Sequence, residues 1–301
     1  MSETTRAGYI ALLGRPNVGK STLLNRLIRQ KISITSPKPQ TTRHTILGIK
    51  TEGDVQMVFV DTPGLHRSAR NAMNRYLNRA AASVLGYVDV AVLVVEALRW
   101  SEEDEAVLER LAEFSGPVIL AINKVDRLAD KSLLLPFIQT LVGKREFAAV
   151  VPLSAVKRAN LEALEQEITA RLPEAPFYFS EDQVTTASQR FLAAELIREK
   201  LTRILHDELP YALTVEIEQF QEEGRLLRIH AVVWVEREGQ KAIVIGEGGH
   251  VLKEAGRQAR EDMEKIFERK VFLQTWVKVR EGWSDDERAL HSLGYQDDKL
   301  G

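Results

Sequence analysis

Gly14-Arg15-Pro16-Asn17-Val18-Gly19-Lys20-Ser21 follows an apolar run, Tyr9–Leu13, and leads directly into a helical pattern that begins at Thr22. This stretch has the pattern of a phosphate-binding loop, because its two glycines let successive backbone N–H groups and a helix N-terminus face an anion. The ammonium of Lys20 and the hydroxyl of Ser21 complete a site for two phosphates and a Mg²⁺ ion. A strand before the loop and a helix after it are the context that the motif requires. The stretch therefore predicts a nucleotide-binding α/β domain.

Composition places few other limits on the chain. Its 301 residues favour about two domains, and 44% hydrophobic with 28% charged residues excludes disordered and fibrous classes. The absence of cysteine excludes disulfides and thiolate metal sites and fits a reducing compartment. The N-terminus lacks an apolar signal core, and the longest apolar stretch, Val88–Val95, is too short to span a membrane. We therefore expect a soluble, cytoplasmic protein.

Charge is distributed unevenly along the chain. Residues 1–172 hold 23 Lys and Arg against 18 Asp and Glu, whereas the remaining residues hold 18 against 25. Bulk attraction of the acidic C-terminal part to a phosphate backbone should be weak. A nucleic-acid role there would need a local binding site rather than a general basic face.

Short β-rich runs alternate with helical patterns from Tyr9 to about Leu172. Such alternation predicts a doubly wound α/β domain with a mostly parallel six-stranded sheet and ligands at the carboxyl ends of the strands. Residues 44–60 form a hairpin pattern, which adds one antiparallel strand. The predicted strands are Tyr9–Leu13, Thr45–Lys50, Val55–Val60, Val88–Val95, Pro117–Ile122 and Phe147–Pro152, and the predicted helices are Lys20–Arg29, Asn71–Leu85, Ser101–Phe114, Lys131–Leu141 and Asn160–Arg171. Ser101 is the predicted N-cap of its helix.

The alternation ends at a proline-bearing segment, which predicts a linker over residues 173–187 between domains 1–172 and 188–301. Beyond it the pattern is α-β-β-α-α-β, the order of a smaller α+β domain. Its predicted elements are a helix over Ser188–His206, a strand from Leu213, a strand over Leu226–Val235, an apolar face over Lys241–Ile245, a helix over His250–Glu268 and a strand over Val271–Val279.

Two turns at predicted strand ends identify the nucleotide. Asp61-Thr62-Pro63-Gly64 places a carboxylate where it can hold Mg²⁺ through water, and the Gly64 N–H beside a γ-phosphate. Asn123-Lys124-Val125-Asp126 is more discriminating, because one carboxylate can accept both the N1–H and the exocyclic amine of guanine. Adenine would leave Asp126 charged and unpaired, which opposes a P-loop ATPase or kinase. Asn123 can bridge the loop and the base, the Lys124 stem can cover the ring, and a backbone N–H of Ser154-Ala155 can reach O6.

The predicted GTP-binding residues are therefore Gly14, Arg15, Pro16, Asn17, Val18, Gly19, Lys20, Ser21, Thr22, Asp61, Thr62, Pro63, Gly64, Asn123, Lys124, Asp126, Ser154 and Ala155. The polar segment Ile32–His44 is the predicted switch, in which Thr42 reaches Mg²⁺ and the γ-phosphate only while GTP is bound. Thr41 is the alternative if the register is shifted by one. The predicted Mg²⁺ ligands are Ser21, Thr42 and, through water, Asp61.

Hydrolysis needs an oriented water molecule. Leu65 follows Gly64, and an apolar side chain cannot orient water, so we expect slow intrinsic turnover. Asn17 suggests another device, a K⁺ ion near the β,γ-bridging oxygen; the alternative is that Asn17 only braces the loop. The predicted catalytic residues are Lys20, Thr42, Asn17 and Gly64.

Gly246-Glu247-Gly248-Gly249 matches the Gly-x-x-Gly element with which KH modules approach single-stranded nucleic acid. The α-β-β-α-α-β order gives this short match its weight. The predicted RNA-binding residues are Lys241, Gly246, Glu247, Gly248, Gly249, Lys253 and Arg257, with Arg260 on the same helix face. Glu247 is unfavourable beside phosphate, so RNA affinity should depend more on Lys241, Lys253, Arg257 and base contacts than on the loop. Trp100, Trp234, Trp276 and Trp283 are interpreted as core or hinge residues, and Trp283 alone is kept as an alternative RNA contact.

Together these motifs resemble the Era family of bacterial GTPases, whose members join a GTPase domain to a C-terminal KH type II domain. The residues that carry the resemblance are Gly14–Ser21, Gln40–His44, Asp61–Gly64, Asn123–Asp126, Ser154-Ala155 and the KH-like module. The resemblance implies GTP hydrolysis coupled to binding of the 3′ end of 16S ribosomal RNA, in 30S subunit maturation. It also implies a monomer in the cytoplasm, with peripheral association at the inner membrane and no DNA partner. Where an Era-like loop carries a basic residue after its first glycine, this chain has Glu247.

One alternative from another class remains open. A signalling GTPase could use the same second domain to dock proteins and bind no RNA, and the acidic C-terminal part favours that reading. The Gly-x-x-Gly loop and the basic helix face favour RNA. The six histidines show no ligand spacing, so we expect no metal other than Mg²⁺ and the possible K⁺.

Overall fold

The structure is a computed structural model that describes residues 4–38, 41–64, 72–206 and 209–295. Contacts divide the chain into two units. The N-terminal unit contains Met1–Ser33, Thr42–Ala69 and Leu77–Thr186. The C-terminal unit contains Ala187–Gly301 together with two earlier segments, Ile34–Thr41 and Arg70–Tyr76. The middle of the predicted switch segment, residues 34–41, thus belongs to the C-terminal unit, and its two ends belong to the N-terminal unit.

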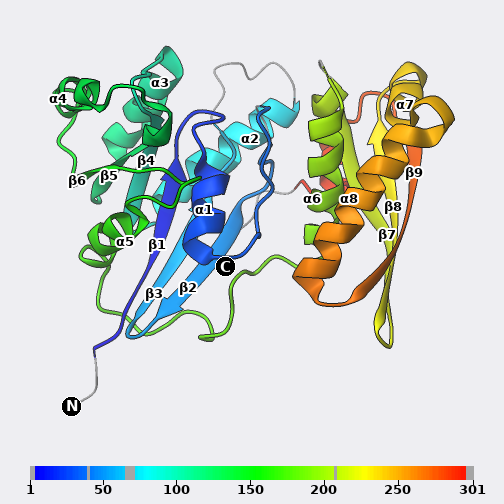
Figure 1. The fold of residues 1–301 in the computed structure, drawn as a ribbon, viewed down its shortest axis with the longest axis horizontal. Coiled ribbons are helices and arrows are strands. Elements are labelled where there is room, and N and C mark those ends of the chain that lie inside the picture. The colour runs from blue at the N-terminus through cyan, green and yellow to red at the C-terminus, as the bar shows by residue number, and fades with distance from the viewer. Residues whose placement is uncertain (1–3, 39–40, 65–71, 207–208, 296–301) are drawn as a thin grey trace. The chain divides into compact units, whose positions relative to one another are not determined.

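A six-stranded sheet forms the centre of the N-terminal unit (Figure 1), with the strand order β2-β3-β1-β4-β5-β6. Only β2 is antiparallel to its neighbour. The predicted doubly wound fold, with one antiparallel strand contributed by a hairpin, is confirmed. The strands are β1 (Arg6–Leu13), β2 (Ile46–Glu52), β3 (Val55–Asp61), β4 (Val90–Glu96), β5 (Val118–Asn123) and β6 (Ala149–Pro152).

Helices lie on both faces of this sheet. Helices α1 (Lys20–Ile28) and α5 (Leu161–Thr169) lie in front of it in Figure 1. Apolar residues of α2 (Ala72–Ser83), α3 (Glu102–Arg110) and α4 (Leu134–Val142) share a core with the opposite face. Because both faces are covered, β4 and β5 read as continuous apolar runs, and their residues are buried.

Local signals set the ends of these helices. Ser101 caps α3, as predicted: its side chain accepts from the backbone of Asp104, whose carboxylate accepts from the Ser101 N–H (2.9 Å). The predicted helix over 131–141 begins instead with a 3-10 turn, Lys131–Leu133, before α4. Residue 71, the predicted start of α2, lies outside the described residues.

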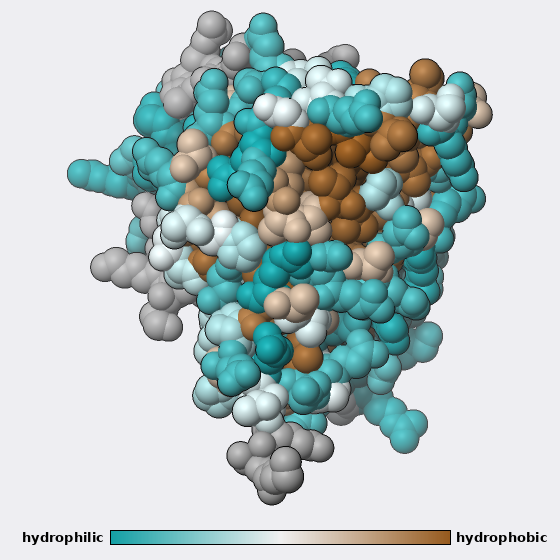
Figure 2. All heavy atoms as spheres, turned by 90° about the vertical axis from the view of Figure 1, so that its left-hand side faces the viewer, coloured by the Kyte–Doolittle hydropathy of each residue, from teal (hydrophilic) through white to brown (hydrophobic). Residues whose placement is uncertain are grey.

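Helix α4 exposes apolar side chains. Leu135 is 62% exposed and Val142 44%, while Leu141 is buried against the core. Figure 2 views the molecule from the side on which α4 lies in Figure 1 and shows apolar side chains gathered there. Leu135 is therefore a large exposed apolar residue on a helix outside the nucleotide-binding motifs.

The C-terminal unit follows the predicted α-β-β-α-α-β order. Helices α6, α7 and α8 pack on one face of a three-stranded sheet, β7-β8-β9, in which β8 and β9 are parallel. The elements are α6 (Gln189–Ile204), β7 (Leu213–Glu223), β8 (Leu226–Val235), α7 (Glu238–Ile245), α8 (His250–Phe267), β9 (Lys270–Val279) and a short α9 (Glu287–Ser292). The predicted apolar face at 241–245 belongs to α7, whose Val244 is fully buried. Across the described part of the chain, no helix combines the length and apolar character that crossing a bilayer would need.

The core interpretation of Trp283 is confirmed and its alternative role as an RNA contact is wrong, while the core interpretation of Trp276 is wrong. Trp283, the candidate RNA contact, has no exposed surface; its ring stacks on Tyr295 and its indole N–H donates to the Ala212 carbonyl (3.3 Å). Trp276, interpreted as a core or hinge residue, is 38% exposed on the sheet face opposite the helices. Residue type alone could not distinguish these two positions. The in-and-out alternation of side chains along β9 exposes Trp276, and packing of the segment after β9 buries Trp283.

Candidate functional site

The phosphate-binding loop joins the end of β1 to the start of α1. Gly14 and Gly19 have φ angles of 150° and 106°, which favour glycine. A Cβ atom on Gly14 would lie 2.4 Å from the Val94 carbonyl oxygen, so the close approach of β1 and β4 also requires a residue without a side chain. Asn17, at φ 64°, occupies the left-handed region at the middle of the loop. The loop is thus held open by its backbone and ends on the N-terminus of α1.

Lys20 lies at the centre of this loop and is only 6% exposed. Its Nζ donates to the carbonyl oxygens of Gly14 (2.8 Å) and Arg15 (3.1 Å). Burial lowers the pKa of Lys20 to about 8, and Arg15 adds to this, while the carboxylates of Asp61 and Asp104 raise it. A phosphate placed in the loop would meet a buried ammonium whose present partners are neutral carbonyls.

The side chain of Arg15 is engaged away from the loop. It is 5% exposed, and its guanidinium donates to Asp104 (3.0 Å) and Glu96 (2.9 Å). Because the guanidinium is bonded to these carboxylates, only the backbone of Arg15 remains to contact a phosphate. Burial would raise the pKa of Glu96, but hydrogen bonds and charge from Lys124 and Arg15 outweigh it and lower the pKa. Glu96 therefore remains ionised between the phosphate loop and the Asn-Lys-Val-Asp turn.

Three predicted Mg²⁺ ligands lie together. The hydroxyl oxygens of Ser21 and Thr42 are 2.9 Å apart. Asp61 has no exposed surface; its Oδ2 accepts from Ser33 (2.8 Å), and its Oδ1 is buried without a hydrogen-bond partner among the described residues. Burial raises the pKa of Asp61, while Lys20 and neighbouring hydroxyls lower it.

These groups fit Mg²⁺. Hydroxyl and carboxylate oxygens are the donors that the ion prefers, and it usually keeps few protein ligands beside waters and phosphates. Within the described ranges, no cluster of three His, Asp or Glu side chains offers a fuller protein cage. Thr42, rather than Thr41, is brought to Ser21: the Thr41 hydroxyl donates to the Lys38 carbonyl (2.7 Å) instead.

The Asp-Thr-Pro-Gly turn contacts the phosphate-binding loop directly. A Cβ atom on Gly64 would lie 2.9 Å from Cγ of Pro16, so only glycine fits there without movement. The Thr62 hydroxyl donates to the Leu12 carbonyl (3.0 Å) and ties the turn to β1. Leu65, on which the prediction of slow hydrolysis depends, lies outside the described residues, as does Gln40.

One buried amide joins the loops of the predicted base site. Asn123, 3% exposed, donates from Nδ2 to the Val18 carbonyl (2.8 Å) and accepts at Oδ1 from the backbone N–H of Lys124 (2.8 Å) and Ala155 (3.0 Å). A Cβ atom on Gly19 would lie 2.4 Å from that Nδ2. Asn123 therefore positions the phosphate loop and both base-site loops at once.

Asp126 is exposed at the end of β5, and its Oδ1 accepts from the Ser154 hydroxyl (2.5 Å). Lys124, at φ 67°, places its ammonium 3.1 Å from Glu96. The two N–H groups predicted for guanine O6 already have acceptors: Ser154 N donates to Ala159 O (3.1 Å) and Ala155 N to Asn123 Oδ1. The Asp126 carboxylate is thus open to a base. A contact to guanine O6 would have to share an N–H group that already donates to Ala159 or Asn123.

The Gly-x-x-Gly loop turns sharply between α7 and α8. Gly246, Gly248 and Gly249 have φ angles of 73°, 58° and 78°. A Cβ atom on Gly246 would lie 2.6 Å from Val251, whereas one on Gly248 would meet nothing within 4 Å. The glycine that packs tightly is thus Gly246, and Gly248 presents its backbone to solvent beside the exposed Glu247.

The predicted basic residues around this loop are mostly paired. Lys253 Nζ donates to the Gly248 carbonyl (3.2 Å), and Lys241 lies 3.6 Å from Glu238. Arg257 bonds Glu254 and Glu261, and Arg260 bonds Glu264, all one turn away on α8. Lys253 is thus the predicted basic residue that the structure brings onto the loop, and the acidic residues of α8 neutralise its arginines.

Comparison with known proteins identifies the family. A family model described as 50S ribosome-binding GTPase matches residues 9–124, and one described as KH domain matches residues 208–284. GTPase Era of Azotobacter vinelandii is 58% identical over 97% of this chain and 97% of its own length. The chain belongs to the Era family of GTPases. A second member, GTPase Era of Pseudomonas syringae pv. tomato, is 58% identical over 99% of this chain and 100% of its own length.

Solved Era structures have the same fold. Aquifex aeolicus Era bound to GDP.AlF4- matches with a TM-score of 0.92 at 37% identity, covering 97% of this chain and 99% of that one. Era in complex with MgGDPNP and nucleotides 1506-1542 of 16S ribosomal RNA matches equally well. The predicted family, fold and GTPase activity are therefore confirmed: this Era-family chain is a GTP-hydrolysing enzyme with a KH domain.

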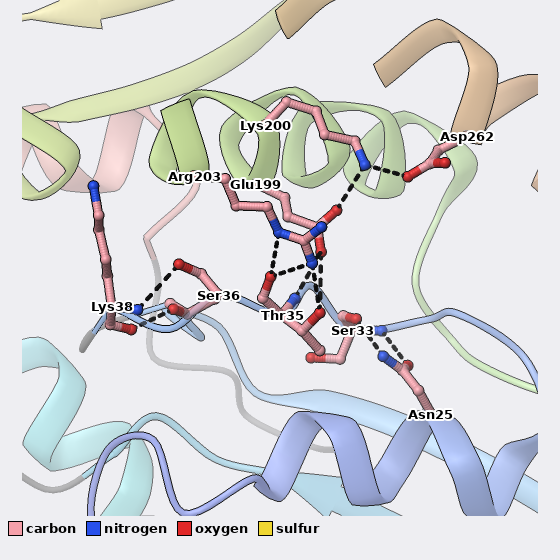
Figure 3. A network of polar contacts seen from close by, with 10 residues as sticks. Asn25, Ser33, Thr35, Ser36, Lys38, Glu199, Lys200, Arg203 and Asp262 are labelled. Carbon is pink, nitrogen blue, oxygen red and sulfur yellow. Dashed lines mark hydrogen bonds and ion pairs between the residues drawn. The ribbon is translucent and has the colours of Figure 1, made fainter. Parts of the chain in front are cut away.

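In this Era-family chain a segment of the predicted switch is held by α6. Within the C-terminal unit, Thr35 donates from its backbone N–H to Oε1 of Glu199 (2.9 Å), and Arg203 donates to the Thr35 carbonyl (2.7 Å) (Figure 3). Glu199 has no exposed surface and also lies 3.4 Å from Lys200, which bonds Asp262. The sequence pattern predicted a segment poorly ordered by itself; these α6 partners, 160 and more positions away, carried no local signal.

Proposed function

We propose that this chain is a GTP-dependent switch that binds single-stranded RNA, namely the 3′ end of 16S ribosomal RNA, during assembly of the 30S subunit. The observation that supports it most is the Era complex with MgGDPNP and nucleotides 1506-1542 of 16S ribosomal RNA, whose protein matches this chain over both units at a TM-score of 0.92. The open backbone at Gly248 and the match to a KH domain favour a single-stranded ligand. In this proposal residues 1–172 bind nucleotide and residues 188–301 bind RNA.

At the nucleotide site we assign roles by geometry. Lys20 binds the β- and γ-phosphates, Asn123 braces the loops, and Asp126 accepts from guanine. Ser21 and Thr42 hold Mg²⁺, with Asp61 behind a water ligand. When bound, the ion neutralises charge that develops on the β- and γ-phosphate oxygens. The chain itself supplies positioning, since the backbone of Gly64 lies against Pro16 in the phosphate loop.

We further propose that K⁺ assists hydrolysis. Asn17 lies at the middle of the phosphate loop with a left-handed backbone, φ 64°, and no hydrogen bond of its side chain holds it elsewhere in the described ranges. An amide oxygen there is a suitable ligand for a monovalent cation beside the bridging oxygen. We expect GTP turnover to be at least tenfold faster in K⁺ than in Na⁺ buffer, as for other charge-stabilising devices, and Asn17→Ala to abolish the difference. Equal rates in the two buffers, measured by phosphate release, would refute the role.

The RNA function is tested at Gly248. A Cβ atom at this position would meet no atom within 4 Å, and aspartate tolerates the left-handed backbone better than most residues, so the domain should stay folded. Its charge would face the phosphate backbone, and we expect RNA affinity to fall about tenfold or more, since like-charge contacts at an interface cost several kcal/mol. Filter binding of a single-stranded 16S 3′-end RNA measures this. Gly248→Asn, of the same shape but neutral, is the control. Gly246→Asp is unsuitable because it would clash with Val251.

The rival function is a GTPase whose second domain docks proteins. The ion pairs that neutralise Arg257 and Arg260, and the exposed Glu247, favour it. The same titration separates the two functions. If wild-type protein does not bind the 16S 3′-end RNA, the RNA function is wrong and protein docking is the better account of this domain; equal, tight binding by wild type and Gly248→Asp would instead remove Gly248 from the RNA contact.

A further inference from the structure

The sheet of the C-terminal unit has one face that the helices do not cover. Alternate residues of β8, from Leu227 to Val235, point into the core beneath α6 and α8. The residues between them point the other way. On this outer face Phe272 is 41% exposed and Trp276 38% exposed, with His230 half-buried between them on β8. We call these three side chains the ring platform.

The rings of the platform contact one another without stacking. His230 meets Phe272 at 6.3 Å with an interplanar angle of 64°, and Trp276 at 5.4 Å with an angle of 82°. These are edge-to-face contacts, so no two of these rings lie parallel in a stack. The Nε2 atom of His230 is buried and has no hydrogen-bond partner among the described residues. The platform is therefore a row of aromatic surfaces at successive positions across two strands.

Cations flank the platform but are already neutralised. The Arg228 guanidinium lies 4.8 Å from the Phe272 ring centroid and is paired with Glu223 (2.9 Å). Lys278 lies over Trp234 and is paired with Glu218 (2.6 Å). A ligand that recognised this face by charge would find little net potential. A ligand that recognised it by stacking would find exposed rings.

We propose that the ring platform is a second contact site for single-stranded RNA, on which unpaired bases stack. Bases bind aromatic side chains on open sheet faces in this way, and stacking tolerates any base because each has a π-face. This inference rests on the proposed RNA function and extends it to a surface outside the Gly-x-x-Gly loop. Base stacking also gives a reason for large aromatic residues to stay exposed here, although apolar surface in contact with water is unfavourable.

The Gly-x-x-Gly loop and the ring platform are both connected to β9, an edge strand of the sheet. Helix α7, which leads into Gly246, packs against β9, the strand that carries Phe272 and Trp276. A strand of RNA held by its backbone at the loop can therefore pass the edge of the sheet and place later nucleotides on the rings. A short RNA that only fills the loop would not reach them.

The experiment compares two single-stranded RNAs in full-length protein, one of about four nucleotides, the length a Gly-x-x-Gly loop clamps, and one of about 16. We expect Trp276→Ala to weaken the longer RNA about tenfold and to leave the shorter one unchanged. Trp276→Phe keeps a stacking ring, so it should bind within about twofold of wild type. Leu135→Ala, which removes another exposed apolar side chain on α4, is the matched control and should change neither affinity.

Fluorescence supplies a readout that does not depend on a destabilising substitution. Stacking of a base on Trp276 should quench the emission of wild-type protein when the longer RNA is added, and Trp276→Phe should lose most of that quenching while it still binds. If the longer RNA binds Trp276→Ala as tightly as wild type and quenching is the same in Trp276→Phe, the platform is not an RNA site. If wild type binds neither RNA, the proposed RNA function itself fails.

Discussion

Replacement of Asp126 by asparagine should lower GTP affinity by about three to four orders of magnitude, the penalty for a polar site that loses its matched partner. The carboxylate accepts two neighbouring donors of guanine, and an amide can accept only one while its NH₂ group meets the exocyclic amine. Xanthine carries a carbonyl at that position, so xanthosine triphosphate should bind the variant better than GTP does. Competition against a fluorescent guanine nucleotide measures both affinities.

The structure supplies a control for this prediction. Asp130 is another exposed carboxylate four residues further along, and it accepts from the Ser132 backbone (2.8 Å) rather than facing the base site. Asp130→Asn should bind GTP like wild type. The Ser154 hydroxyl can donate to the amide oxygen at position 126 as it does to the carboxylate, so the loop should keep its shape. Wild-type GTP affinity in Asp126→Asn would mean that another group reads the base.

The parts of the site that local sequence could predict are those in which one short segment does the whole task. The loop from Gly14 to Ser21 and the turn at Asn123 each carry their strand end, backbone geometry and polar groups within a few residues. Ser21 and Thr42, which were assigned separately, do meet, at 2.9 Å. The tertiary partners gave no such signal: Ser33 on Asp61, and Glu96 with Asp104 on Arg15, join residues 28 to 89 positions apart.

The ring platform illustrates a signal that was present but not used. The β9 sequence alternates, with Phe272, Gln274, Trp276 and Lys278 at even positions and apolar Val271 and Val277 at odd ones. A period of two with apolar residues on one side predicts that the even positions face solvent. Residue type alone assigned all four tryptophans to the core or a hinge, which is right for Trp283 and wrong for Trp276.

Replacement of Glu199 by alanine should lower the unfolding free energy of the C-terminal unit by about 3 to 5 kcal/mol, the usual cost of breaking a buried ion pair on one side. Its carboxylate, without exposed surface, accepts from the Thr35 backbone and lies 3.4 Å from Lys200 and 3.0 Å from Arg203. Alanine would leave the Thr35 N–H and the buried Lys200 with fewer partners. Glu199→Gln keeps an acceptor for Thr35 without the charge and should fall between alanine and wild type.

The same substitution should release the segment that begins at Ile34. Glu199 and Arg203 of α6 hold Thr35. Lys38 donates to the Leu205 carbonyl at the end of α6, and Arg198 of α6 donates to the Thr41 carbonyl. Hydrogen exchange should therefore accelerate first at Thr35 in Glu199→Ala, and urea unfolding should report the loss of stability.

Glu254→Ala is the control. The pKa of Glu254 is lowered to about 2 by Arg257 and Gln258, yet this pair is open to solvent, so its removal should leave the urea midpoint unchanged. If both variants lowered the urea midpoint equally, burial of Glu199 would not be the reason for its contribution to stability.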